Sequence, residues 1–333
     1  MTPRMLIGLL SSVSASTALH IPAATLHQHA LELRDKGFTV INDSGIDRQL
    51  IQNAAVSCSA EFDRMRENVA RLGIDPNEDL FAFSEIVTRH RKRYGFQPQG
   101  PSAWTELVDE AVRSVASPVI ETLHTLPPHE DDIPEKAPEL TGWARHLLPA
   151  QPVVEHVDCI ISQLGAKAQG FHPDAGDTHI KLARLNARHR LFNVFCPLTD
   201  LQEDGDGTMF WPRSHHRSGV DRFNAAIKRS GALEADALAM SEMAVPACKA
   251  GGVILFDFRL LHRGMPNTGG ERAIAHAVLS TGFATDPLTF PSTSLRELVE
   301  ALPSDPDALQ QELAAIAEQQ RKEWMAVRSS SFR

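Results

Sequence analysis

The sequence is poor in cysteine, and its few cysteines form no recognisable pattern. Four occur among 333 residues, and none belongs to a Cys-x-x-Cys pair. Such wide spacing in a chain of this length argues against a disulfide framework and against a zinc site made of thiolates. We therefore expect core thiols, in a protein of a reducing compartment, at Cys58, Cys159, Cys196 and Cys248.

Signature motifs of several large enzyme classes are also missing. There is no Gly-x-x-x-x-Gly-Lys-Ser/Thr and no Gly-x-Gly-x-x-Gly after a predicted strand, so P-loop phosphate binding and dinucleotide binding have no support. The absence of Gly-x-Ser-x-Gly and of His-Glu-x-x-His argues in the same way against a serine hydrolase and a zinc protease. Any catalytic chemistry must come from another arrangement of side chains.

Positive charge and long apolar runs are scarce as well. The formal net charge is -9, which argues against a protein that coats nucleic acid. The sequence has no apolar run of about 18 residues, so we expect no transmembrane helix. Hydrophobic residues make up 42% and charged residues 23%, which is typical of a globular chain with a sizeable core.

The N-terminal segment, residues 1–20, is basic, rich in serine and free of acidic residues, as targeting peptides are. Two interpretations stay open, a targeting peptide and an inert extension. A cytoplasmic and an organellar location are therefore both open.

The first half of the chain is expected to be mainly helical. Apolar spacing predicts helices over 46–72 and 102–124, the second strained at Pro118, and a short strand over 38–41. An acidic, proline-rich stretch at 127–138 predicts a loop or boundary.

After residue 150 the pattern changes to short apolar runs separated by turns, which is typical of an antiparallel sandwich or barrel. A helical insert is expected at 219–242, and the chain returns to helix from Ser304 onward. The expected strands lie at 153–154, 159–161, 191–195, 208–211, 253–258 and 274–279. The sequence therefore predicts an α+β protein with a mainly β core and flanking helices.

Histidine next but one to aspartate is the pattern with the clearest chemical meaning. On a strand, residues two apart point to the same side, so a His-x-Asp pair can supply two of the three ligands of a two-histidine, one-carboxylate iron site. The pair occurs three times, at His129, His156 and His172. His129 lies in the acidic loop, and His156 is most simply a strand-end histidine. His172 precedes a Gly-containing turn, where active-site residues are often displayed.

A third ligand and an anion-binding group follow the apolar strand at 253–258. His262 comes just after this strand, and Arg272 begins the next strand. Arginine grips a carboxylate with two parallel hydrogen bonds, which suits a 2-oxoglutarate cosubstrate. His276 alternates with Arg272, and it is interpreted either as a core histidine or as a substrate contact.

Three stretches resemble the phytanoyl-CoA dioxygenase family of iron(II)- and 2-oxoglutarate-dependent oxygenases, within a similarity that covers roughly residues 30–285. They are GFHPDAG at 170–176, FCPLTDLQEDGDGTMFWPRSHH at 195–216 and VILFDFRLLHRGMPNTGGER at 253–272. The resemblance implies a double-stranded β-helix, or jelly roll, at about 150–285 within a single domain at 21–290. A helical extension at 291–333 would follow it.

The resemblance also implies roles for individual residues. His172, Asp174 and His262 would be the ligands of Fe(II), and Arg272 would bind the distal carboxylate of 2-oxoglutarate. Asn193 would be a weaker cosubstrate contact. Because family-like halogenases lack the carboxylate, Asp174 favours hydroxylation or a related oxidation that uses O2.

Two departures from the family pattern affect the pocket and leave the metal ligands intact. Phe171 stands where tryptophan is common, and Arg213 stands where glycine is usual. We expect an iron(II)- and 2-oxoglutarate-dependent dioxygenase, a monomer or homodimer, that acts on a small molecule and not on nucleic acid. A jelly-roll metal hydrolase or isomerase, and a non-catalytic binding protein of the same fold, are the alternatives.

Overall fold

The computed structural model describes residues 21–127, 129–130, 151–175, 190–203, 205, 207–216, 221, 243–281 and 290–330. The N-terminal segment at 1–20 lies outside these ranges, as do all but one residue of the helical insert expected at 219–242 and most of the loop expected at 127–138.

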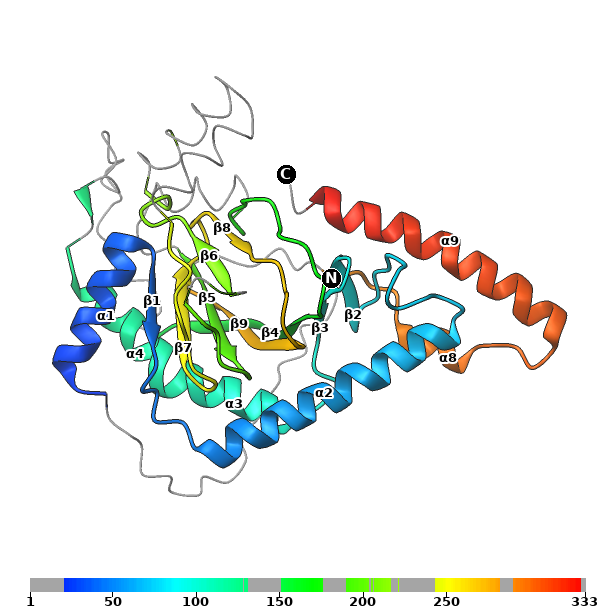
Figure 1. Ribbon diagram of the computed structural model, residues 1–333, viewed down its shortest axis with the longest axis horizontal. Helices are drawn as coiled ribbons and strands as arrows, with labels where there is room; N and C mark the ends of the chain where they lie inside the picture. Colours follow the sequence, from blue (N-terminus) through cyan, green and yellow to red (C-terminus); the bar gives the residue numbers. More distant parts are fainter. Residues whose placement is uncertain are drawn as a thin grey trace, which may run out of the picture.

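Seven strands form one antiparallel sheet, and two short strands form a second sheet (Figure 1). The order in the large sheet is β1-β7-β5-β9-β4-β3-β2. Its strands are β1 (Phe38–Ile41), β2 (Ile86–His90), β3 (Arg93–Phe96), β4 (Val153–Ser162), β5 (Leu191–Pro197), β7 (Val253–Asp257) and β9 (Arg272–Ser280). The small sheet contains β6 (Thr208–Phe210) and β8 (His262–Gly264). The two sheets make the predicted jelly roll, and the helices lie around it.

An aromatic cluster fills the space between the two sheets. Phe38, Phe195 and Phe256 of the large sheet belong to the same buried cluster as Phe210 of β6. The rings of Phe38 and Phe210 stack with their centroids 4.7 Å apart, and the ring of Phe256 lies 5.1 Å from that of Phe210. This cluster is the inner core of the jelly roll.

The opposite face of the large sheet packs on helices. Figure 1 shows α2 (Arg48–Arg71), α3 (Ala103–Ala111) and α4 (Ser117–Thr125) on the side of the sheet away from β6 and β8. The side chains of the strands alternate between the two faces, as extended chains require. In β5, for example, Val194 packs in the helix-side cluster and Phe195 in the inner one.

The expected helix over 46–72 is confirmed as α2. Asp47 caps its first turn by accepting hydrogen bonds from the backbone of Gln49 and Leu50. The expected helix over 102–124 is divided into α3 and α4 by a π-helical turn, Val112–Ala116. Pro118 explains the division, because it has no N–H to donate and its ring clashes with the carbonyl four residues earlier.

The described residues of the first half are mainly helical, as expected, but they also contain a hairpin, β2–β3, that the sequence did not predict. Its two strands are joined at Arg91 and Lys92, and Lys92 has a φ of 60°. Hairpin turns with positive φ usually carry glycine or asparagine. Two basic residues at the turn gave no such signal, so the sequence pattern did not identify the hairpin.

Two C-terminal helices, α8 (Leu295–Glu300) and α9 (Pro306–Ser330), are hydrogen-bonded to the region of this hairpin. The Trp324 indole donates a hydrogen bond to the carbonyl of Thr88 at 2.6 Å, and Gln320 Oε1 accepts one from the backbone of Ala82 at 3.0 Å. Glu85 accepts bonds from Ser294 and from the backbone of Leu295. Among the described residues, no helix has both the length and the apolar character needed to cross a membrane.

A buried carboxylate on α2 provides a test of this packing. Glu61 accepts hydrogen bonds from the Trp104 indole at 2.6 Å and from the backbone of Gln99 at 2.7 Å. We expect Glu61→Ala to lower the free energy of unfolding by about 1–3 kcal/mol, because both donors lose their partner. Glu67→Ala, at an exposed position of the same helix, should change it by less than about 0.5 kcal/mol. Urea unfolding of both variants checks this, and equal effects would contradict it.

Candidate metal centre

The centre is built on a direct backbone pairing of His172 with His262. Each backbone N–H donates to the other residue's carbonyl, and both bonds are 3.0 Å long. In an antiparallel pair, residues that exchange both bonds project their side chains to the same face. The two imidazole rings therefore lie side by side, with centroids 4.7 Å apart.

Both rings are held in the tautomer that a metal ligand needs. His172 Nδ1 lies 2.9 Å from the carbonyl of Gly170, and His262 Nδ1 lies 2.9 Å from the carbonyl of Leu260. A carbonyl oxygen only accepts, so each Nδ1 carries the hydrogen. In its neutral form, each ring then keeps a free electron pair on Nε2, as metal-binding histidines commonly do.

Asp174 completes the group. Its backbone N–H donates to the carbonyl of Phe258 at 3.0 Å, which ties the turn after His172 to the end of β7. Its Oδ1 lies 3.8 Å from Nε2 of His172, and its Oδ2 lies 3.5 Å from Nε2 of His262. Three ligand-type atoms from two separate segments thus lie within 4.8 Å of one another.

The ionisation of these groups suits a divalent cation. Desolvation in the pocket, followed by the neighbouring His262 ring, lowers the pKa of His172. Burial alone would raise the pKa of Asp174, but His262, His172 and the hydrogen bond from Asn193 outweigh it, and the pKa lies below its ordinary value. A neutral imidazole and an ionised carboxylate are the forms that bind metal.

The donor set fits iron(II), because two imidazole nitrogens and one carboxylate oxygen are the ligands of non-heme iron oxygenases. The group is accessible from one side. The side chain of His262 is 7% exposed, whereas those of His172 and Asp174 are 27% and 31% exposed. His172 and Asp174 are therefore the more exposed members of the group.

Arg272 lies at the start of β9, opposite Ser162 of β4, and it is buried. A second guanidinium, that of Arg93 on β3, is buried near it. Burial and then the positive charge of Arg272 lower the pKa of Arg93 to about 10. Two buried positive charges make this end of the jelly roll a favourable place for an anion.

Asn193 is buried beside the metal-binding group. Its Nδ2 donates a hydrogen bond to Asp174 Oδ2 at 2.8 Å, and its oxygen faces His276 Nε2 at 2.8 Å. The sequence indicated a cosubstrate contact for Asn193, which stays a prediction. It did not indicate the bond to Asp174.

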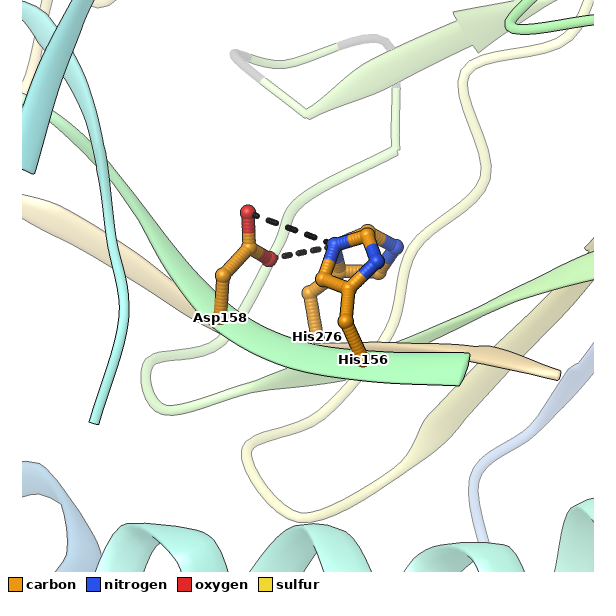
Figure 2. Close-up of side chains that lie close together, drawn as sticks. All are labelled: His156, Asp158 and His276. Atoms are coloured by element: carbon orange, nitrogen blue, oxygen red, sulfur yellow. Dashed lines mark hydrogen bonds and ion pairs between the residues drawn. The ribbon is translucent and has the colours of Figure 1, made fainter. Parts of the chain in front are cut away.

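A second His-Asp-His group, which the sequence interpretation missed, lies on the inner face of the large sheet (Figure 2). Figure 2 shows His156 and Asp158 on β4 and His276 on β9, close to one another. The signal for it was the second His-x-Asp pair, together with the alternation of His276 along its strand. The third pair, beginning at His129, has its aspartate outside the described residues.

The comparisons with known proteins agree with this description. A family model described as "Phytanoyl-CoA dioxygenase (PhyH)" matches residues 33–275. The chain belongs to the phytanoyl-CoA dioxygenase family. It is accordingly a non-heme, iron(II)- and 2-oxoglutarate-dependent enzyme, with O2 as the other cosubstrate. No curated protein matches its sequence.

Several solved structures are similar to this one. AviO1 from Streptomyces viridochromogenes Tue57 is 14% identical, with a TM-score of 0.46, over 78% of this chain and 96% of that chain. The α-ketoglutarate-dependent carbocyclase SnoK from nogalamycin biosynthesis is 15% identical, with a TM-score of 0.46, over 84% and 92%. HygX from Streptomyces hygroscopicus, with nickel, 2-oxoglutarate and hygromycin B bound, is 12% identical, with a TM-score of 0.43, over 78% and 88%.

Proposed function

We propose that this family member is a dioxygenase that hydroxylates, or otherwise oxidises, a C–H bond of a small organic substrate. The observation that carries the proposal is the convergence of His172, Asp174 and His262, whose ligand-type atoms lie within 4.8 Å of one another. These three side chains would hold Fe(II) and leave its other positions to the cosubstrates. When bound, the metal supplies activation of O2 coupled to oxidation of 2-oxoglutarate to succinate and CO2.

The protein's contribution is orientation. The two imidazoles are fixed by their Nδ1 hydrogen bonds to backbone carbonyls, and Asp174 is fixed through its backbone and through Asn193. Ligands held in this way need little reorganisation when metal and cosubstrate bind.

Arg272 would bind the distal carboxylate of 2-oxoglutarate through two parallel hydrogen bonds. The positive charge of Arg93 adds to the attraction for this carboxylate, because Arg93 is buried close enough to Arg272 for their charges to interact. A fixed distal end sets the orientation of the 2-oxo acid end of the cosubstrate.

The aromatic cluster would keep water away from the inner side of the centre. The His262 ring lies 5.1 Å from the Phe256 ring and 6.2 Å from the Phe210 ring. The presence of Asp174 supports oxygen insertion over halogenation, because a carboxylate stands where family-like halogenases leave room for chloride.

Loss of a ligand tests the metal site. We expect Asp174→Ala and His172→Ala to weaken Co(II) or Mn(II) binding by more than about 100-fold, beyond the effect usual for outer hydrogen-bond partners. Both variants should also lose succinate formation. His27→Ala, at an exposed position of the helix α1 (Ala23–Lys36), is the control and should match the wild type. Titration calorimetry measures binding, and an Asp174→Ala variant with unchanged affinity and turnover would refute the assignment.

Loss of the arginine tests the cosubstrate site. Arg272→Ala should raise the KM for 2-oxoglutarate at least about tenfold, because a charge-assisted hydrogen bond contributes about 1.5–3 kcal/mol. The KM of Arg272→Lys should lie between those of the wild type and Arg272→Ala, since lysine keeps the positive charge and loses the two parallel hydrogen bonds. Succinate formation against 2-oxoglutarate concentration measures this, with Arg71→Ala on the surface of α2 as control. An unchanged saturation curve for Arg272→Ala would exclude the role.

The reaction itself is tested by oxygen consumption. With Fe(II), 2-oxoglutarate and a candidate substrate, the enzyme should consume O2 and form succinate, and mass spectrometry should find a product heavier by one oxygen atom. Metal binding without any O2 consumption across a broad set of small molecules would favour a hydrolase or isomerase.

A further inference from the structure

A chain of hydrogen bonds leads from Asp174 into the wall of the large sheet. Asn193 Nδ2 donates to Asp174 Oδ2 at 2.8 Å, and the amide oxygen of Asn193 lies 2.8 Å from His276 Nε2. The other ring nitrogen of His276 lies 2.5 Å from Asp158 Oδ1. Asp158, Asn193 and His276 are no more than 6% exposed, so this chain is shielded from solvent.

Strand register brings the three buried members together. Asp158 of β4 is directly opposite His276 of β9, and Phe195 of β5 is opposite His276 on the other side. Asn193 is two residues from Phe195, so it shares the inner face and lies diagonally across from His276. Three neighbouring strands, β5, β9 and β4, therefore contribute one link each.

The acceptors along the chain can be assigned without ambiguity. An ionised carboxylate only accepts, so the NH2 group of Asn193 must face Asp174. The amide oxygen then faces Nε2 of His276, and Nδ1 faces the Asp158 carboxylate. Both ring nitrogens of His276 therefore face acceptor oxygens, one on each side.

Asp158 is the fixed end of the chain. Arg89 of β2 donates to its Oδ2 at 2.7 Å. Burial alone would raise the pKa of Asp158, but His276 and Arg89 outweigh it and hold the pKa well below its usual range. A buried carboxylate that is bonded to Arg89 on one side and to the His276 ring on the other keeps its position, because any movement would break these hydrogen bonds.

We propose that Asp158, His276 and Asn193 form a positioning chain that orients the Asp174 carboxylate for metal binding. The proposal rests on the metal site proposed above. Asp174 needs such a support, because its side chain is 31% exposed and it lies in a bend of the chain rather than in one of the described strands. The hydrogen bond to Oδ2 restricts rotation of the carboxylate and transfers the rigidity of the sheet to the turn.

A metal ion at the second His-Asp-His group is the competing interpretation. Its ligand-type atoms lie within 4.8 Å of one another, and His156 Nε2 is 3.9 Å from Asp158 Oδ2. However, the Arg89 guanidinium already occupies Oδ2, and both nitrogens of His276 face acceptor oxygens. A divalent cation there would lie beside the Arg89 guanidinium in a buried place, where such repulsion is strong. The His172–Asp174 pair therefore serves the metal, and Asp158 of the His156–Asp158 pair serves the positioning chain.

The test interrupts the chain of hydrogen bonds at two places and measures Co(II) affinity in the absence of turnover. Asn193→Leu keeps the shape of asparagine and removes the donor to Asp174, and His276→Leu removes the next link. We expect each to weaken Co(II) binding about 10- to 100-fold. The double variant should lose no more Co(II) affinity than the weaker-binding single variant, because one broken link already disconnects Asp174 from Asp158. Additive losses would contradict the proposal.

A conservative variant separates positioning from general destabilisation. His276→Gln keeps an N–H directed at Asn193, so its Co(II) affinity should return to within about threefold of the wild type, although its melting temperature is lowered. If His276→Gln binds Co(II) as weakly as His276→Leu, the positioning role is excluded. An Asn193→Leu variant with a raised KM for 2-oxoglutarate and unchanged Co(II) affinity would make Asn193 a cosubstrate contact instead.

His156→Ala is the matched control, because His156 belongs to the second group and not to the positioning chain. It should bind one Co(II) per chain with wild-type affinity. Two Co(II) in the wild type and one in His156→Ala would establish a second metal site and overturn the proposal. Asp174→Ala distinguishes failure of the proposed metal site from failure of the positioning chain. If it keeps Co(II), the proposed metal site itself fails. If it loses Co(II) while Asn193→Leu and His276→Leu keep it, only the positioning chain fails.

Discussion

Two backbone hydrogen bonds between His172 and His262 are the constraint on which the centre depends. They join segments that are distant in sequence, and they force both imidazoles to the same face of the small sheet. Asp174 follows two residues later and is tied by its backbone to the end of β7. The carboxylate therefore reaches the imidazoles without a long flexible connection. Side chains elsewhere can change the metal affinity, but the backbone hydrogen bonds determine that His172, Asp174 and His262 lie close together.

The strict alternation of the sheet gives each strand of the wall two separate tasks. Val194 of β5 and Ala277 of β9 face the helices, where only apolar packing is needed. Asn193 and His276, their neighbours in sequence, face inward and carry polar groups. Because the larger hydrophobic cluster lies on the helix side, the inner side can hold polar groups beside its aromatic cluster. The buried charge of Asp158, for example, is paired with that of Arg89, which offsets the cost of burial.

The sequence identified what depends on local pattern, and it missed what depends on the order of strands. Most of the strands, the helix α2 and the convergence of His172, Asp174 and His262 were predicted from spacing, turns and resemblance. The link from Asp158 through His276 to Asn193 was not, because nothing in the local sequence states that β9 lies between β4 and β5. The hairpin β2–β3 was missed because its turn carries Arg91 and Lys92, which give no hairpin signal.

The attachment of the last helix to the hairpin has a practical consequence for anyone trimming the protein. Trp324 and Gln320 of α9 bond to the backbone of Thr88 and Ala82, and the strand that contains Thr88 also carries Arg89, the partner of Asp158. Shortening the chain at its C-terminal end would release the backbone beside Arg89, although the cut is made far in sequence from His172, Asp174 and His262. An affinity tag or a fusion partner should accordingly be joined beyond the end of α9, because a shortened tail risks disturbing catalysis from a distance.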